Sequence, residues 1–132
     1  MVSGIGFENL KVWIDARCLS KQIFKLSLNG PLKRNFTLRE QICKSCISVV
    51  SNKAEGYERG GDKEFHQFLS HAKASAGELR AQLFMCLDLG YIGDEEFNHL
   101  RGEVLSISRQ LSGLMKYLKQ SGYKGSKFKQ EN

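Results

Sequence analysis

Two cysteines three positions apart, Cys43 and Cys46, are the chain's best candidates for metal or redox chemistry. Such a pair binds zinc when two further ligands complete a tetrahedral site, and redox pairs belong to mixed folds of strands and helices. The remaining cysteines, Cys18 and Cys86, are isolated, and no histidine lies at a ligand spacing from them. Because Cys43 and Cys46 also fall on the apolar side of a predicted helix, we interpret them as buried apolar residues and expect no metal and no cofactor.

Histidines and carboxylates do not form a catalytic constellation. His66 and His71 are five residues apart, a poor spacing for one helix face, and His99 is distant from both. A di-iron site in a helical bundle needs two Glu-x-x-His pairs, a requirement that this sequence does not meet. Walker, HExxH and nucleotide-binding glycine motifs are absent. The sequence therefore favours a protein that is not an enzyme.

Polar residues recur along one side of the second predicted helix and along one side of the third. One interpretation is a solvated face, and the other is a hydrogen-bonded network between helices or subunits. Serine and asparagine are weak helix formers, and they suit a surface position less well than lysine or glutamate would. The candidate members of this polar seam are Gln41, Ser48, Asn52, Glu55, Arg59, Ser75 and Glu78.

The C-terminal region interleaves basic and aromatic residues. Such a composition can neutralise phosphates and stack bases, although a soluble frayed end has the same composition. The aromatic members are Tyr117, Tyr123 and Phe128. The candidate nucleic-acid-binding lysines are Lys116, Lys119, Lys124, Lys127 and Lys129.

Helices must position all of these side chains. The chain has 132 residues and one proline, Pro31, so one domain with long uninterrupted helices is expected. Apolar stripes at helical spacing predict helices over residues 7–28 and 37–59, a third that Asp62 caps and Gly90 ends, and a fourth that Asp94 caps and Gly122 ends. The Thr37 to Glu40 stretch has the form of a capping box.

The predicted architecture is an all-α, antiparallel, up-down-up-down four-helix bundle. The bundle domain covers residues 1–122, and residues 123–132 form a flexible basic tail.

The first two predicted helices carry more apolar residues than one buried stripe needs. Leu10, Ile14, Phe24 and Leu28 lie outside the main stripe of the first helix, and Ile47 belongs to a second stripe on the other. A compact bundle that surrounds these helices would explain the excess, and so would self-association.

Net charge and hydropathy limit the partners. The formal net charge is +6, which favours an acidic partner such as RNA, DNA or an anionic surface, although a soluble basic surface needs no such partner. No segment is long and apolar enough to cross a membrane, and no secretory signal is visible. We therefore expect a cytoplasmic protein with reduced thiols and no membrane partner.

Several stretches of the sequence together carry a resemblance. They are residues 7–13, 41–42, 52–56, 63–65, 68–69, 78–79 and 89–92, with Ser48, Ala72 and Ser75. These stretches resemble the bacterial four-helix bundle proteins encoded within intervening sequences of large ribosomal RNA genes, once labelled ribosomal proteins. The match runs from about residue 7 to residue 118, and Lys53 departs from it because the family usually has an apolar residue there.

The resemblance implies an antiparallel four-helix bundle and a homo-oligomer, with a pentamer as the best single expectation. It also implies a similarity of fold to the accessory proteins of diversity-generating retroelements, which have basic surfaces that face nucleic acid. Our leading hypothesis is a non-enzymatic oligomeric scaffold that binds structured RNA or a ribonucleoprotein. The alternative is a protein–protein adaptor with no nucleic-acid contact.

Overall fold

The structure, a computed structural model, describes residues 9–58 and 61–122, with residues 52–58, 62 and 121–122 described by their helical backbone alone. Every long element is a helix, and no strand occurs within the described ranges. The predicted all-α class is therefore confirmed. The helices are α1 (Lys11–Ser27), α2 (Gly30–Arg34), α3 (Phe36–Glu58), α4 (Asp62–Asp88), α5 (Asp94–Tyr117) and the terminal π-helix η2 (Leu118–Gly122).

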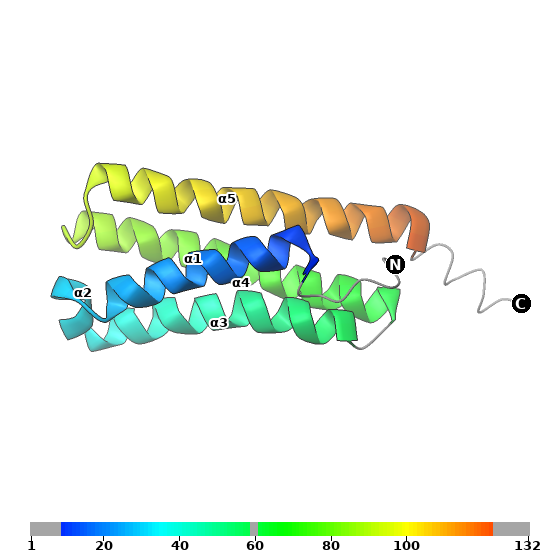
Figure 1. The fold of residues 1–132 in the computed structure, drawn as a ribbon, viewed down its shortest axis with the longest axis horizontal. Helices are drawn as coiled ribbons and strands as arrows, with labels where there is room; N and C mark the ends of the chain where they lie inside the picture. The colour runs from blue at the N-terminus through cyan, green and yellow to red at the C-terminus, as the bar shows by residue number, and fades with distance from the viewer. Residues whose placement is uncertain (1–8, 59–60, 123–132) are drawn as a thin grey trace, which may run out of the picture.

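Four long helices lie side by side and form an elongated helical bundle (Figure 1). Helix α1 packs against α3 and α5, and α4 packs against the same two neighbours, so α1 and α4 are diagonal to each other. The short helix α2 and the turn between α4 and α5 lie together at one end of the bundle (Figure 1).

The core runs the length of the bundle between these helices, as the apolar stripes of α1, α4 and α5 predicted. Phe65 and Ile23 are among the largest side chains that it buries completely. Its other large members are Leu32, Ile42, Leu69, Leu79, Leu83, Val104, Ile107, Leu111 and Leu118.

Pro31 lies at the start of a short helix, α2, that follows the end of α1. Helix α1 ends at Ser27, and Gly30 then takes a φ of +66°, a backbone conformation that glycine adopts without a steric penalty. Pro31 lies in the first turn of α2, where the backbone N–H that proline lacks would have no helical partner. Helix α2 was not predicted, because five residues give too little apolar periodicity to detect.

Asn35 rather than Thr37 caps α3, so the predicted capping box is wrong. The Asn35 Oδ1 atom accepts a hydrogen bond from the backbone N–H of Leu38 at 3.1 Å. Its Nδ2 atom donates to the hydroxyl of Tyr91 at 3.0 Å, which ties the start of α3 to the turn after α4. The helix therefore begins at Phe36, one residue before the predicted start.

Two further predicted caps are displaced by one residue. Gly61 and Gly93 occupy the N-cap positions of α4 and α5, and neither helix has a side-chain capping bond. Asp62 and Asp94 are instead the first helical residues, where a negative charge still interacts favourably with the helix dipole.

A left-handed glycine terminates α4 as predicted. Gly90 has a φ of +75°, and its N–H donates to the carbonyl of Leu87 at 3.0 Å. The next N–H, from Tyr91, donates to the carbonyl of Cys86 at 2.8 Å. These two bonds form a Schellman motif, which satisfies carbonyl groups that the helix end leaves free.

Gly90→Ala is expected to lower the free energy of unfolding by about 1–2 kcal/mol, because a side chain is strained in the left-handed conformation. Gly102→Ala is the matched control, since a Cβ added there, within α5, meets open space. This control should raise the free energy of unfolding by about 0.5–1 kcal/mol, the gain expected for alanine over glycine inside a helix. Urea unfolding followed by circular dichroism measures the free energy of unfolding of both variants. A change of the same sign in the two would contradict the left-handed conformation assigned to Gly90.

Candidate functional site

Basic side chains concentrate on α1 and α2. Residues 16–39 contain six lysines and arginines and no aspartate or glutamate. All but Arg39 are exposed, and within the described part of the chain none of the six forms an ion pair. The six are Arg17, Lys21, Lys25, Lys33, Arg34 and Arg39, which we call the basic surface.

Helix ends position the basic surface. Lys25 lies in the last turn of α1, and Lys33 and Arg34 lie in the last turn of α2, where cations interact favourably with the negative end of the helix dipole. The Arg39 Nη1 atom donates to the backbone carbonyl of Lys33 at 3.0 Å, and its guanidinium lies 5.3 Å from the centre of the Phe36 ring. Lys25, Lys33 and Arg39, from three helices, therefore lie at the α2 end of the bundle.

Net charge differs between two stretches of the chain, residues 9–51 and residues 61–122. Residues 9–51 contain eight lysines and arginines and two acidic residues, a net charge of +6. Residues 61–122 contain seven lysines and arginines and eight acidic residues, a net charge of −1. The nucleic-acid contacts predicted from the sequence lie only in the C-terminal region and do not include the basic surface. The signal was available, because the 24 residues from 16 to 39 contain no carboxylate.

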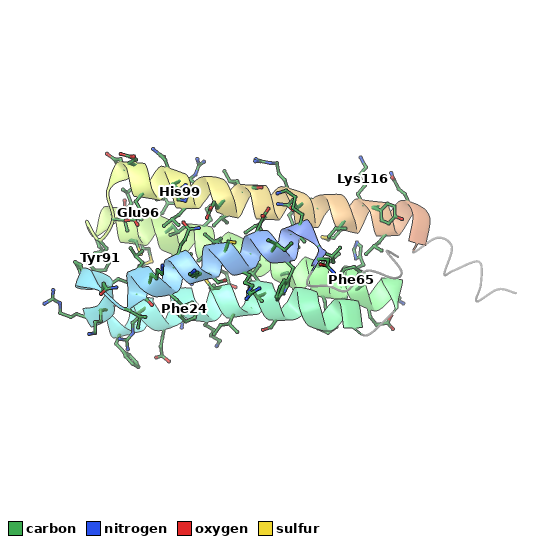
Figure 2. The ribbon with its side chains drawn as sticks, in the orientation of Figure 1. Phe24, Phe65, Tyr91, Glu96, His99 and Lys116 are labelled. Carbon is green, nitrogen blue, oxygen red and sulfur yellow. The ribbon has the colours of Figure 1, made fainter. Side chains whose placement is uncertain are left out.

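The lysines predicted to bind nucleic acid lie elsewhere. Lys116 and Lys119 are exposed near the end of α5 and in η2. Figure 2 places Lys116 far from Tyr91 and Glu96, which mark the α2 end of the bundle. Lys124, Lys127 and Lys129 lie outside the described residues.

A hydrogen bond between helices joins two described members of the predicted polar seam. The hydroxyls of Ser48 on α3 and Ser75 on α4 are 2.6 Å apart, and Ser75 is buried. Gln41 and Glu78 are exposed. The side chains of Asn52 and Glu55, and the whole of Arg59, lie outside the described residues. Among the described members, the bond that links two helices joins helices of the same chain.

Ser75→Ala is expected to lower the free energy of unfolding by about 0.5–1.5 kcal/mol, because the buried Ser75 side chain loses its hydrogen bond to Ser48. The double variant with Ser48→Ala should cost less than the sum of the single changes, since it removes both partners. Ser70→Ala, at an exposed position of α4, is the control and should shift stability by less than about 0.5 kcal/mol. Thermal unfolding measures these differences, and an unchanged midpoint for Ser75→Ala would favour the solvated-face interpretation.

Polar contacts that the sequence did not indicate tie α1 to α5. Gln22 Nε2 donates to Glu103 at 2.8 Å, and Gln22 Oε1 lies 2.9 Å from His99 Nε2. Asp15 accepts hydrogen bonds from Lys11 at 2.6 Å and from Gln110 at 2.8 Å.

These hydrogen bonds, chiefly the one from Lys11, lower the pKa of Asp15 below its ordinary value. Asp15 is therefore ionised at neutral pH and forms its ion pair with Lys11. Asp15 does not pair with Arg17, Lys21 or Lys25, the other cations of α1.

The cysteine pair does not present two exposed thiols. Cys46 is buried, and desolvation raises the pKa of its thiol to about 12, so it stays protonated at neutral pH. The half-buried Cys43 lies with its sulfur 3.5 Å from the hydroxyl of Ser27. No group of three or more potential metal ligands occurs among the residues that the structure describes.

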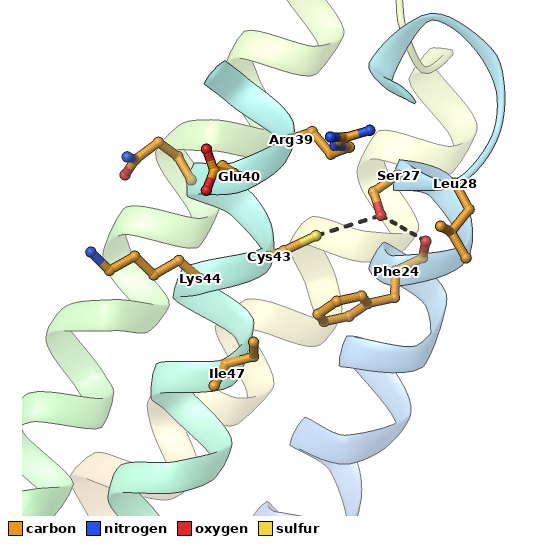
Figure 3. Close-up of a pocket in the computed structure, with 9 residues that line it drawn as sticks. Phe24, Ser27, Leu28, Arg39, Glu40, Cys43, Lys44 and Ile47 are labelled. Atoms are coloured by element: carbon orange, nitrogen blue, oxygen red, sulfur yellow. Dashed lines mark hydrogen bonds between the residues drawn. The ribbon is translucent and has the colours of Figure 1, made fainter. Parts of the chain in front are cut away.

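A groove of about 530 Å³ opens between the end of α1 and the start of α3 (Figure 3). Phe24, Cys43 and Ile47 lie between the two helices, with Leu28 at one end (Figure 3). Leu28 is 63% exposed and Ile47 is 54% exposed. The excess apolar residues predicted on the first two long helices are therefore partly on the surface, and three of them, Phe24, Leu28 and Ile47, line this groove. The remaining lining residues are Ser27, Arg39, Glu40, Gln41 and Lys44.

The elongated helical bundle and the cations of its first helices define a class of all-helical proteins with a basic surface. The chain belongs to the family of 23S rRNA-intervening sequence proteins, whose model matches residues 8–113. The resemblance found in the sequence is thereby confirmed, whereas the link to retroelement accessory proteins stays a prediction.

A solved structure shares this fold. It is a protein with unknown function from the S23 ribosomal protein family of Bacteroides thetaiotaomicron, which aligns with a TM-score of 0.73 and 21% identity. The alignment covers 80% of this chain and 98% of that chain. A search of curated proteins finds no match. None of the helices in the described residues is long and apolar enough to cross a membrane.

Proposed function

We propose that this protein is a non-enzymatic homo-oligomeric module that binds structured RNA or a ribonucleoprotein through its basic surface, on an antiparallel up-down-up-down four-helix bundle. The observation that carries the proposal is the run of six cations without a carboxylate in residues 16–39. Five of them are exposed, and none of the six forms an ion pair within the described residues. Unpaired cations on adjacent helix ends are available to phosphates.

Phosphate contacts give affinity without reading sequence. A double-stranded RNA exposes its backbone and 2′-hydroxyl groups, while its narrow major groove excludes side chains. A rigid surface of lysines and arginines therefore matches the shape of a folded RNA better than it matches a base sequence. One copy offers few contacts, and several copies in one assembly bind with greater avidity.

Self-association is the second part of the proposal. Ile14 on α1 and Ile47 on α3 are 44% and 54% exposed, and Phe24 and Leu28 add apolar side chains to the groove between these helices. Exposed apolar surface of this kind favours burial against another copy. We expect a homo-oligomer, with a pentamer as the best single value. Light scattering coupled to gel filtration measures the mass, and a monomer at micromolar concentration would refute this part.

Fluorescence anisotropy with a labelled RNA hairpin, over a range of salt concentrations, tests the RNA part. The logarithm of affinity should fall linearly with the logarithm of salt concentration. Deletion of residues 123–132 should weaken binding and flatten that slope while the helical circular-dichroism spectrum is retained. No binding at low salt by the intact oligomer would refute RNA recognition and favour a protein–protein adaptor.

A further inference from the structure

A second hollow, of about 460 Å³, lies at the α2 end of the bundle, and we call it the end hollow. Its walls come from the last turns of α1, from α2, from the turn between α4 and α5, and from the first turn of α5. It shares no lining residue with the α1–α3 groove. Its volume falls within the range of pockets that hold small molecules, and a single nucleotide is of that size.

An ammonium group and a carboxylate line the end hollow without pairing to each other. Lys25 belongs to the basic surface, and Glu96 lies in the first turn of α5. Both side chains are exposed, and neither forms an ion pair within the described residues. Figure 2 shows Glu96 and Tyr91 toward this same end of the bundle. The end hollow therefore offers an occupant one cation and one group that only accepts hydrogen bonds.

Hydrogen bonds hold two further polar side chains of the end hollow in place. The Tyr91 hydroxyl accepts a hydrogen bond from Asn35 Nδ2 at 3.0 Å, so its own proton stays available to an acceptor. Asn29 Nδ2 donates to the backbone carbonyl of Lys25 at 2.9 Å. Walls that are fixed before an occupant arrives reduce the entropic cost of binding it.

Guanine is the RNA base whose Watson–Crick edge suits the Glu96 carboxylate. Its N1–H and N2 amino groups are adjacent donors, and an ionised carboxylate accepts with both of its oxygens. The other three RNA bases place an acceptor next to each donor on this edge, and a carboxylate repels an acceptor. Hydrogen bonds to an ionised acceptor are roughly twice as strong as those between neutral groups. The carboxylate therefore discriminates between bases.

The surroundings of Glu96 suit the rest of a nucleotide. Pro31 and Leu32 give the end hollow an apolar wall for a base, and Lys25 can neutralise a phosphate. Lys33 and Arg34 directly follow Leu32, so cations continue from the end hollow along α2. A carboxylate beside a basic surface weakens its general attraction for phosphates. A base with two donors turns that unfavourable charge into a specific contact.

We infer that the end hollow receives one unpaired guanine of an RNA loop, with Glu96 accepting from its N1–H and N2 amino groups and Lys25 contacting its phosphate. The inference rests on the proposed RNA binding and adds recognition of one base to it. The cations of the basic surface bind the RNA backbone without regard to sequence, whereas this carboxylate selects the base.

Two RNA hairpins with the same stem test the inference, one with an all-adenine loop and one with a single guanine in that loop. Both carry the same number of phosphates, so at one salt concentration they differ only in the base. The wild-type protein should bind the guanine hairpin about tenfold more tightly, with equal salt slopes for the two. A hairpin with inosine, which lacks the 2-amino donor, should bind with intermediate affinity.

Glu96→Gln should abolish the preference for guanine, because the amide replaces one acceptor oxygen with a donor. The same variant should bind the adenine hairpin slightly more tightly, since it removes a negative charge. Glu95→Gln is the matched control: Glu95 is also exposed in the first turn of α5 but does not line the end hollow. It makes the same charge change and should keep the wild-type preference. An unchanged preference in Glu96→Gln would overturn the inference.

The wild-type titrations separate this inference from the proposed function. Equal affinity for the two hairpins would refute the guanine site and leave RNA binding in place. Binding of neither hairpin at low salt would refute both. Displacement of the guanine hairpin by micromolar guanosine monophosphate would indicate a site for a free nucleotide and overturn the contact to an RNA loop. Fluorescence anisotropy of labelled hairpins measures each of these outcomes.

Discussion

Reversing four charges of the basic surface is expected to weaken binding to an RNA hairpin by about two to three orders of magnitude at low salt. The changes are Lys21→Glu, Lys25→Glu, Lys33→Glu and Arg34→Glu. All four side chains are exposed and lack an ion pair among the described residues, so each is available to a phosphate. Because each phosphate contact releases about one counterion, the slope of log affinity against log salt should fall by about three.

A matched variant separates a specific surface from total charge. Lys63→Glu, Lys73→Glu, Arg80→Glu and Arg109→Glu change the net charge by the same amount at exposed positions of α4 and α5. This control should lose far less affinity, because long-range attraction between exposed charges is screened by salt. Anisotropy titrations at matched salt measure both variants. An equal loss in the two would mean that RNA responds to net charge alone and that the basic surface is not the site.

Ile23→Ala is expected to lower the free energy of unfolding by about 2–5 kcal/mol. The Ile23 side chain is fully buried in the core, so its removal leaves a cavity as well as losing burial of apolar surface. For a domain of this length, such a loss corresponds to a fall in the melting temperature of roughly 10 °C or more. Thermal and urea unfolding followed by circular dichroism measure the change.

Ile14→Ala is the control for this core substitution, because Ile14 belongs to the same helix and is 44% exposed. The same chemical change there should cost about 1 kcal/mol or less, since little apolar surface returns to water. Similar losses of unfolding free energy at the two positions would contradict the burial of Ile23 and the exposure of Ile14. The comparison also tests the division between the predicted main stripe, which contains Ile23, and the excess apolar residues outside it.

The fold could largely be predicted from apolar spacing and chain-breaking residues. The main stripe of α1 and those of α4 and α5 are buried, and Gly90 ends α4 through a left-handed conformation. The incorrect predictions concern the short segment between α1 and α3, where a few residues determine how each helix begins. Asn35 caps α3 because its side chain also reaches Tyr91, a partner 56 residues away that no local motif reveals. Helix α2 escaped prediction because local spacing cannot identify five residues as a helix.

The candidate site was predicted less completely than the fold. Composition drew attention to the C-terminal lysines, of which Lys116 and Lys119 are described and exposed. The denser basic surface on α1 and α2 could have been found by counting carboxylates, whose absence from residues 16–39 is visible in the sequence. Serine spacing identified Ser48 and Ser75 as candidates, but it could not establish that these two meet.

The sequence by itself determined the all-helical class, the main apolar stripes and the excess of basic residues, because each depends on residue type and on the fixed period of the helix. Tertiary structure alone decided which excess apolar residues stay exposed, because burial depends on neighbouring helices. It also brought Arg39 of α3 to the backbone carbonyl of Lys33 in α2, and it left Met85 and Leu89 on the surface of α4. Helical period relates residues within one helix, whereas packing sets the distances between helices and therefore determines the interaction surfaces.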